Sequence, residues 1–147
     1  MGYNGYSDKR ISEARKWYRD VRKAGGGHNH VVCVACLRRH GSVEGHTEDY
    51  SKPFGSHIAE HALCFPCHTA VHARFRFPDA WTRYCRQIRG GGQYSDTTDK
   101  RAFEILFHSG GFRPRQVNDS RKITWLDLLP KAEPTQDDEE AEAESLF

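Results

Sequence analysis

Hydrophobic side chains recur at helical spacing in the first part of the chain. The pattern predicts a helix that is capped by Ser7 or Asp8 and runs to about Ala24, where three glycines end it. One face of this helix is apolar, and the opposite face is basic. The apolar face consists of Ile11, Ala14, Trp17, Tyr18 and Val21. The preceding residues 1–7 have the character of a flexible leader.

Beyond this helix, short apolar stretches alternate with segments bounded by glycine or proline. Residues 31–37 fit a strand or a tight knuckle, and a short strand is expected near Val43–His46. Three helices are expected over residues 64–75, 78–89 and 98–108, followed by a capped turn that begins at Thr124. The fold class predicted from these elements is α+β and mostly helical.

Charge is divided unevenly along the 147 residues, which carry +2 in total. Residues 1–130 hold 21 Lys or Arg against 13 Asp or Glu, a net charge of +8. Residues 131–147 hold one Lys against seven acids, a net charge of −6. A basic body with an acidic tail predicts DNA as a partner of the body and disorder of the tail. A solvated basic surface without a partner is the alternative.

The acidic tail closes on the apolar pair of Ser145-Leu146-Phe147. It looks like the tails of single-stranded-DNA-binding proteins and like sliding-clamp-binding peptides. This likeness implies a protein partner for the tail, and disorder that only aids solubility is the simpler alternative. The chain has no apolar run long enough to cross a bilayer and no secretory pattern at its start. We therefore expect no membrane partner and a cytoplasmic location.

Four of the five cysteines form two pairs at metal-ligand spacing. Cys33-x-x-Cys36 and Cys64-x-x-Cys67 are separated by 27 residues. Two knuckles of this kind complete a tetrahedral thiolate shell, which suits a structural Zn²⁺. Buried or redox-active pairs are the alternative, although a redox motif is expected as one pair rather than two. Cys85 falls on the apolar side of a predicted helix and is expected to be a core thiol.

Histidines gather in the same part of the chain, with eight of the nine between residues 28 and 72. His40, His68 or His72 could replace one cysteine as a zinc ligand. The remaining histidines could build a second metal site.

The residues around the cysteines resemble small phage HNH-type proteins, which are similar to the endonuclease VII group. The resemblance rests on Cys33-x-x-Cys36, the segment Val43–Pro53, and Leu63-Cys64-Phe65-Pro66-Cys67-His68 with His72. It covers residues 31–75, about a third of the chain. It implies a zinc-pinned ββα-metal core of the treble-clef or HNH type, in which a strand, a loop and a strand precede a helix. Flanking helices and the disordered acidic tail complete this fold.

The resemblance also implies a catalytic site for Mg²⁺ or another divalent ion between the two strands and the helix. His46 and His68 take the catalytic positions, and both are candidate ligands together with His72, one helical turn further on. In the family, the first strand ends in two adjacent residues, of which the second is the base. Here these residues are His46 and Thr47, and a threonine cannot act as a base near neutral pH.

Three hypotheses follow from Thr47. His46 is itself the base, and Glu44 or Asp49 helps to bind the metal. Alternatively, a loop histidine such as His57 or His61 supplies the base. In the third hypothesis the site is degenerate and the protein only binds DNA.

Four arginines after the second cysteine pair are candidates for phosphate contacts. They are Arg74, Arg76, Arg83 and Arg86. The expected organisation is a basic amphipathic helix over residues 1–27, a zinc-binding core over 28–77, a helical extension over 78–130 and the acidic tail over 131–147.

Two functions remain open from the sequence. One is a phage-type HNH-like DNA endonuclease that hydrolyses phosphodiesters with a divalent ion on a structural-zinc scaffold. The other is a non-catalytic zinc-binding accessory protein of phage replication or host takeover, which binds nucleic acid or a protein partner. If the chain is phage-encoded, the expected location is the host cytoplasm.

Overall fold

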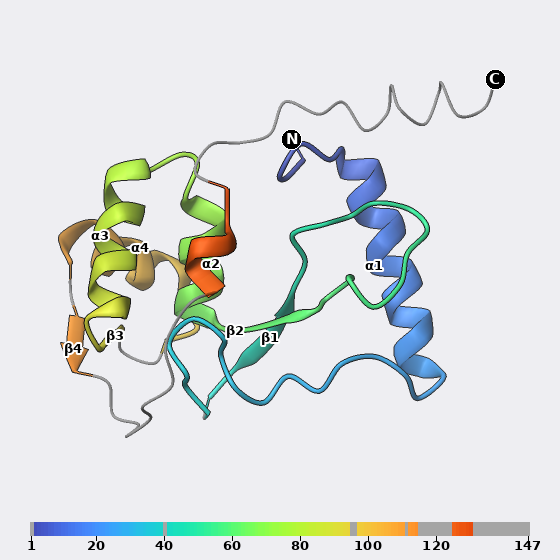
Figure 1. Cartoon of the computed structure of the whole chain (residues 1–147), viewed down its shortest axis with the longest axis horizontal. Coiled ribbons are helices and arrows are strands. Elements are labelled where there is room, and N and C mark those ends of the chain that lie inside the picture. Colours follow the sequence, from blue (N-terminus) through green and yellow to red (C-terminus); the bar gives the residue numbers. More distant parts are fainter. Residues whose placement is uncertain (1, 40, 95–96, 111, 115–124, 131–147) are drawn as a thin grey trace. The chain divides into compact units, whose positions relative to one another are not determined.

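The computed structural model describes residues 2–39, 41–94, 97–110, 112–114 and 125–130. Within these ranges the chain is α+β, with four α-helices, one short 3₁₀ helix and two two-stranded sheets (Figure 1). The expectations for His40, for Thr124 and for the acidic tail over residues 131–147 fall outside the described residues.

The chain divides into two compact units, and neither is one continuous segment. Of the described residues, unit 1 contains residues 2–29 and His46–Glu60. Unit 2 contains the described residues between 30 and 45 and between 61 and 130.

The main element of unit 1 is α1, which spans Asp8–Lys23 and confirms the predicted helix. The side chain of Ser7 caps it by accepting a hydrogen bond from the Arg10 backbone N–H at 3.1 Å. Ile11 and Ala14 on its apolar face are buried, while the other predicted positions of that face are half-buried. The helix ends as expected before Gly25, whose φ of +89° lies in the left-handed region.

A loop over residues 47–60 packs on α1 within unit 1. The Trp17 and Phe54 rings lie 6.1 Å apart, and Arg10, which is 4% exposed, donates a hydrogen bond to the Tyr50 carbonyl oxygen. Lys52 forms an ion pair with Glu13 at 2.7 Å. These contacts fix which face of α1 is turned to solvent.

The N-terminal residues are not the flexible leader that the sequence predicts. Two backbone hydrogen bonds between Tyr3 and Tyr6, at 2.9 and 3.0 Å, close residues 3–6 into a tight turn. Tyr3 is only 9% exposed. The prediction was wrong because it considered local composition, whereas the turn is held by contacts with residues more than forty positions away.

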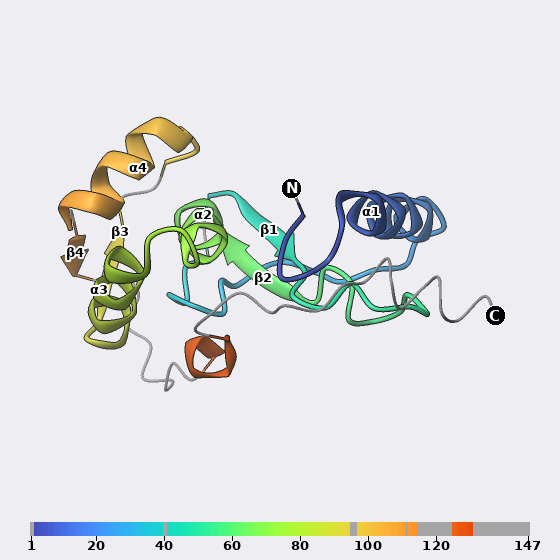
Figure 2. The same ribbon diagram turned by 90° about the horizontal axis from the view of Figure 1, so that it is seen from above.

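Unit 2 contains the other helices, shown from a second side in Figure 2. α2 spans Phe65–Ala73, α3 spans Pro78–Arg89 and α4 spans Lys100–Ser109, all within a few residues of their predicted positions. The short 3₁₀ helix η1 spans Trp125–Leu128. Asp99 caps α4, and Gly110 ends it with a left-handed φ of +77°. α2, α3 and α4 contact one another.

Two small sheets complete the described fold. β1 spans Val43–His46, as predicted, and pairs with β2, which spans His61–Cys64 and runs directly into α2 (Figure 1). β3 (Gly92–Tyr94) pairs antiparallel with β4 (Phe112–Pro114), so that Gln93 faces Arg113 across the ladder. This second pair was not predicted, because the glycines before it indicated only the end of a helix.

The core of unit 2 is largely aromatic. Tyr84 and Tyr94 stack with ring centroids 5.8 Å apart, and Phe103 meets Tyr94 edge-on at 5.0 Å. Phe107 packs on Tyr84 of α3 and on Phe103 of α4. The four cysteines belong to the same buried cluster. Such ring pairs add about 1 kcal/mol each to what their burial contributes. The metal-ligand candidates are therefore part of the hydrophobic core.

Two leucines in η1 give a matched test of this core. Leu126 is 4% exposed, whereas Leu128 is 77% exposed. We expect Leu126→Ala to lower the free energy of unfolding by about 2–4 kcal/mol, because it leaves a cavity, and Leu128→Ala to change it by less than about 0.5 kcal/mol. Urea titration of both variants measures the difference. Equal effects would show that η1 does not pack on the core.

Candidate metal centre

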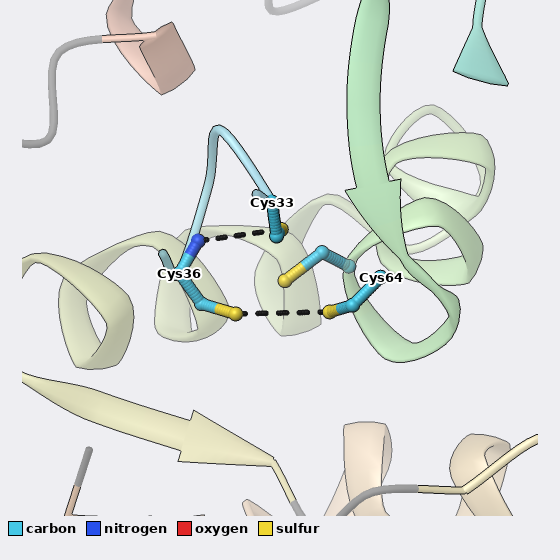
Figure 3. Close-up of side chains that lie close together, drawn as sticks. Cys33, Cys36 and Cys64 are labelled. Carbon is cyan, nitrogen blue, oxygen red and sulfur yellow. Dashed lines mark hydrogen bonds between the residues drawn. The ribbon is translucent and has the colours of Figure 1, made fainter. Parts of the chain in front are cut away.

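Four cysteines converge in the interior of unit 2. One sulfur atom from each of them lies within 4.8 Å of the other three, and all four side chains are at most 1% exposed. Figure 3 shows Cys33 and Cys36 on one loop, facing Cys64 at the end of β2. The four residues that the sequence predicts as zinc ligands are thus brought together.

The first knuckle is shaped by its own backbone. The Leu37 N–H donates to the Cys33 carbonyl oxygen at 2.9 Å, and the Cys33 N–H donates to the Arg38 carbonyl oxygen at the same distance. The Cys36 N–H points at the Cys33 sulfur at 3.5 Å (Figure 3). Leu37 itself has a φ of +66°, a left-handed conformation that costs a non-glycine residue about 1 kcal/mol. This strained residue directly follows Cys36, where the loop turns both sulfurs toward one point.

The second knuckle lies where β2 becomes α2. Cys64 is the last residue of β2 and occupies the N-cap position of α2, and Cys67 lies in the first helical turn. The unpaired N–H groups at a helix start favour negative charge, so this position suits thiolates. The Val34 N–H donates to the Ala62 carbonyl oxygen at 2.8 Å and joins the first knuckle to β2.

The sulfur geometry fits a metal ion better than a disulfide. The Cys36 and Cys64 sulfurs are 3.6 Å apart, and all four thiols are free. A disulfide needs about 2.05 Å. Two sulfurs at about 2.3 Å from one tetrahedral Zn²⁺ would be about 3.8 Å apart. The cluster could therefore hold a metal ion such as zinc.

The ionisation of the thiols supports the same conclusion. Hydrogen bonds from the Cys33, Cys64 and Cys67 thiols lower the pKa of Cys36. Burial raises the pKa of Cys67, and the neighbouring cysteines raise it further. Without a cation, the cluster thus favours the ionisation of one thiol and opposes the ionisation of a second. A divalent ion supplies the positive charge that allows further thiols to ionise.

Two buried polar side chains lie next to the cluster and were missed from the sequence. Gln93 on β3 is fully buried, and its Nε2 donates to the Cys36 sulfur at 3.6 Å. Burial raises the pKa of Tyr84, and the nearby Cys67 sulfur adds to the shift. Tyr84 was predicted only as a core residue of its helix, and nothing in the sequence near Gln93 indicates a contact with a residue 57 positions earlier.

Two of the three histidines predicted to bind the catalytic ion lie together on α2, in unit 2. The Nε2 atoms of His68 and His72 are 3.1 Å apart. Two imidazole nitrogens at about 2.0–2.1 Å from one ion would be about 3.0–3.4 Å apart, so this pair fits shared coordination. The Glu44 carboxylate on β1 lies 3.8 Å from the Nδ1 atom of His68. The spacing of four residues, read from the sequence, correctly predicts that the two rings meet.

The third histidine, His46, belongs to unit 1, where it is 1% exposed. Its Nε2 atom lies 2.5 Å from the Glu48 carboxylate, and the Tyr3 hydroxyl donates to the same carboxylate oxygen. Asn4 donates to the Glu48 carbonyl oxygen at 2.8 Å. A carboxylate in this position favours the imidazole tautomer with its proton on Nε2 and the lone pair on Nδ1. Neither Tyr3 nor Glu48 was predicted for this site.

The other residues considered as the base or as additional metal ligands form hydrogen bonds with the loop over residues 47–60. Thr47 is buried, and its hydroxyl accepts a hydrogen bond from the Ala59 N–H at 2.8 Å. The His57 ring bonds the Ser51 carbonyl oxygen at 2.8 Å. Asp49 accepts hydrogen bonds from the Tyr6 hydroxyl and the Ser51 N–H. For Asp49, burial acts to raise the carboxyl pKa, but these hydrogen bonds outweigh it and lower the pKa overall.

His61 is not the loop residue that the sequence predicts. It begins β2, and its Nδ1 accepts a hydrogen bond from the Trp125 indole N–H at 3.1 Å. The expected loop is therefore shorter, because its last residue pairs in the sheet.

The four arginines predicted to contact phosphate groups have different environments. Arg74 is 1% exposed, and its Nη1 donates to the Val71 carbonyl oxygen at 2.9 Å, so the prediction of a phosphate contact is corrected for this residue. Its guanidinium also lies over the Phe75 ring, 4.2 Å from the centroid. The arginine side chain fills the core with its apolar stem and satisfies backbone oxygens with its head.

Arg83 is half-buried, and its Nη2 donates to the carbonyl oxygens of Phe107 and His108 at 2.5 and 2.7 Å. It therefore satisfies backbone oxygens at the last turn of α4. Arg76 and Arg86 are exposed, so both can reach a ligand in solvent.

Comparisons with protein-family models, with curated proteins and with solved structures find no match for this chain. No helix in the described part of the chain is long and apolar enough to cross a membrane.

Cys85 offers a test of the thiol environment. It is buried as predicted, and burial raises its pKa to about 11. At pH 8 its thiolate fraction is then roughly a hundredfold below that of an ordinary cysteine. We expect iodoacetamide to alkylate Cys85 about a hundredfold more slowly in the native protein than in urea, as measured by mass spectrometry of its peptide. Equal rates would contradict the buried position.

Proposed function

We propose that the chain is a zinc-stabilised, HNH-like endonuclease that hydrolyses phosphodiester bonds of DNA with a divalent ion. The observation that carries the proposal is the pair of imidazole nitrogens of His68 and His72, 3.1 Å apart, one helical turn beyond the four-cysteine cluster. The phage-type HNH resemblance of the sequence accounts for both features together.

The four cysteines would hold Zn²⁺ as a structural ion. All four ligand positions come from the protein and are buried, which leaves no open position for a substrate. The hydrogen bond from Gln93 to Cys36 would orient one thiolate from outside the metal shell. The role of this site is to anchor the start of α2, and thereby the two histidines that follow.

The catalytic ion would be held by His68 and His72, with Glu44 beside them and His46 as a further ligand or base. Supporting this, Glu44 and His46 are two residues apart on β1, so their side chains leave the strand on one face. When bound, a divalent ion would stabilise negative charge on the scissile phosphate group. Imidazole donors favour Mn²⁺, Ni²⁺ or Zn²⁺ over Mg²⁺, which prefers oxygen ligands.

His46 is the residue that we propose as the base. Glu48 holds the Nε2 proton, so the Nδ1 lone pair can accept a proton from the attacking water. Tyr3 donates to Glu48 and keeps the carboxylate directed at the imidazole. In this proposal Glu48 is a positioning residue rather than a catalytic one.

The buried Thr47 favours a second candidate function. Its hydroxyl accepts a hydrogen bond from the Ala59 backbone, so the position where the family has its base serves the loop structure instead. On this basis the alternative is a non-catalytic zinc-binding accessory protein that binds nucleic acid or a protein partner. The two functions differ in whether DNA strands are cut.

The structural metal is tested by matched cysteine variants. We expect about one zinc per chain in the purified protein by atomic emission spectroscopy, and cooperative unfolding when a strong chelator removes it. Cys67→Ser should lose most of the zinc, whereas Cys85→Ser should retain it, because only the first removes a ligand. A metal-free wild-type protein that melts at the same temperature as the purified protein would contradict the zinc site.

Hydrolysis is tested by nicking of supercoiled plasmid with Mg²⁺, Mn²⁺, Ni²⁺ or Zn²⁺. We expect nicking by the wild type, a loss of at least about 100-fold in rate in His46→Ala and in His68→Ala, and wild-type rates in His108→Ala. His108 is an exposed histidine on α4 and serves as the matched control.

Two outcomes distinguish the hypotheses. Absence of nicking by the wild type with every divalent ion would leave the non-catalytic function. Retained activity in His46→Ala together with loss in His57→Ala would assign the base to the loop histidine.

A further inference from the structure

The solvent face of α1 is strongly basic. Six of its cations are exposed, namely Lys9, Arg15, Lys16, Arg19, Arg22 and Lys23. The three acids of the helix offset them only in part, and one of these, Asp20, is exposed four residues after Lys16 and three residues before Lys23. Glu13 is paired with Lys52, and Asp8 at the first turn accepts a hydrogen bond from the Gly2 backbone nitrogen at 2.7 Å.

Helix geometry arranges these cations in two neighbouring rows. Lys9, Lys16 and Lys23 follow one another at intervals of seven residues, so their directions differ by only about 20° per interval. Arg15, Arg19 and Arg22 form the adjacent row at spacings of four and three. With 16 residues, α1 is about 24 Å long, the rise of about seven base pairs of duplex DNA.

We propose that this face of α1 is a binding surface for the sugar-phosphate backbone of duplex DNA. Like charges at neighbouring helix positions repel one another, and a polyanion removes this repulsion while it releases its own counterions. The surface deepens the proposed function and depends on it only for the identity of the partner as DNA. It replaces Arg74, which is buried, and Arg83, which bonds the end of α4, as the source of phosphate contacts.

The buried side of α1 argues against the other polyanionic partners. An amphipathic helix binds a membrane by inserting its apolar face, but here Ile11 and Ala14 are buried and Trp17 packs on Phe54. Proteins that bind single strands stack bases on exposed aromatic rings. Tyr18 instead stacks on the ring of His28, so α1 presents cations without a stacking platform.

The test measures the salt dependence of binding to a fluorescent 24-base-pair duplex, by anisotropy between 50 and 200 mM NaCl without added divalent ion. If all six cations contact phosphate groups, log K against log salt has a slope of about −5. Replacing Lys9, Lys16 and Lys23 together by Gln should reduce the magnitude of this slope by about 3. Glutamine is a good helix former, and circular dichroism verifies that α1 persists.

A matched control removes the same charge from unit 2. Replacing Arg39, Lys100 and Arg101, all exposed, together by Gln should change the slope by less than about 1. Equal losses in both triple variants, or an unchanged slope in the α1 variant, would overturn the proposal. So would binding to vesicles with 30% phosphatidylserine that needs the α1 lysines while duplex binding does not.

The outcome is separable from that of the nuclease test. A wild type that does not nick DNA, with the expected loss of slope in the α1 variant, overturns hydrolysis and supports the surface. Nicking by the wild type with an unchanged slope in the α1 variant supports hydrolysis and overturns the surface.

Discussion

Cys33, Cys36, Cys64 and Cys67 meet in the interior of unit 2, where water cannot stabilise negative charge. The sulfurs are so close that each affects the ionisation of the others. The pKa of Cys36 is lowered by its neighbours, whereas that of Cys67 is raised. A cation among them would resolve this conflict, because it would compensate the charge and hold the sulfurs at a fixed distance. The first knuckle, the end of β2 and the start of α2 all converge on these four sulfurs.

The aromatic cluster of unit 2 packs against the same four cysteines. Tyr84 and Gln93 lie beside the cysteines, and Tyr84 continues the core toward Tyr94, Phe103 and Phe107. Packed aromatic rings thus connect the cysteine cluster with α4. A core of this size is small for its length of chain, and a metal ion held by the cysteines would add stability that apolar burial alone does not supply.

Patterns local in the chain predicted much of the fold. The boundaries of α1 and α3, the strand ending at His46 and the pairing of two cysteine knuckles follow from caps, periodicity and ligand spacing. The errors involve contacts between distant positions. Tyr3 was assigned to a leader and Arg74 to a surface, because no spacing rule connects either with its actual partners. The role of a buried arginine or tyrosine is fixed by the groups around it, which a linear pattern does not contain.

The division into units has a consequence for how the molecule can be cut or recombined. Unit 1 joins residues 2–29 with residues 46–60, and two of the four clustered cysteines of unit 2, Cys33 and Cys36, lie between these two segments in the chain. A cut after α1 would therefore not release a module. It would leave Tyr50 and Phe54 without the helix they pack on. The chain is interlaced rather than modular, so residues 2–29 cannot be transferred to another protein as a folded unit without residues 46–60.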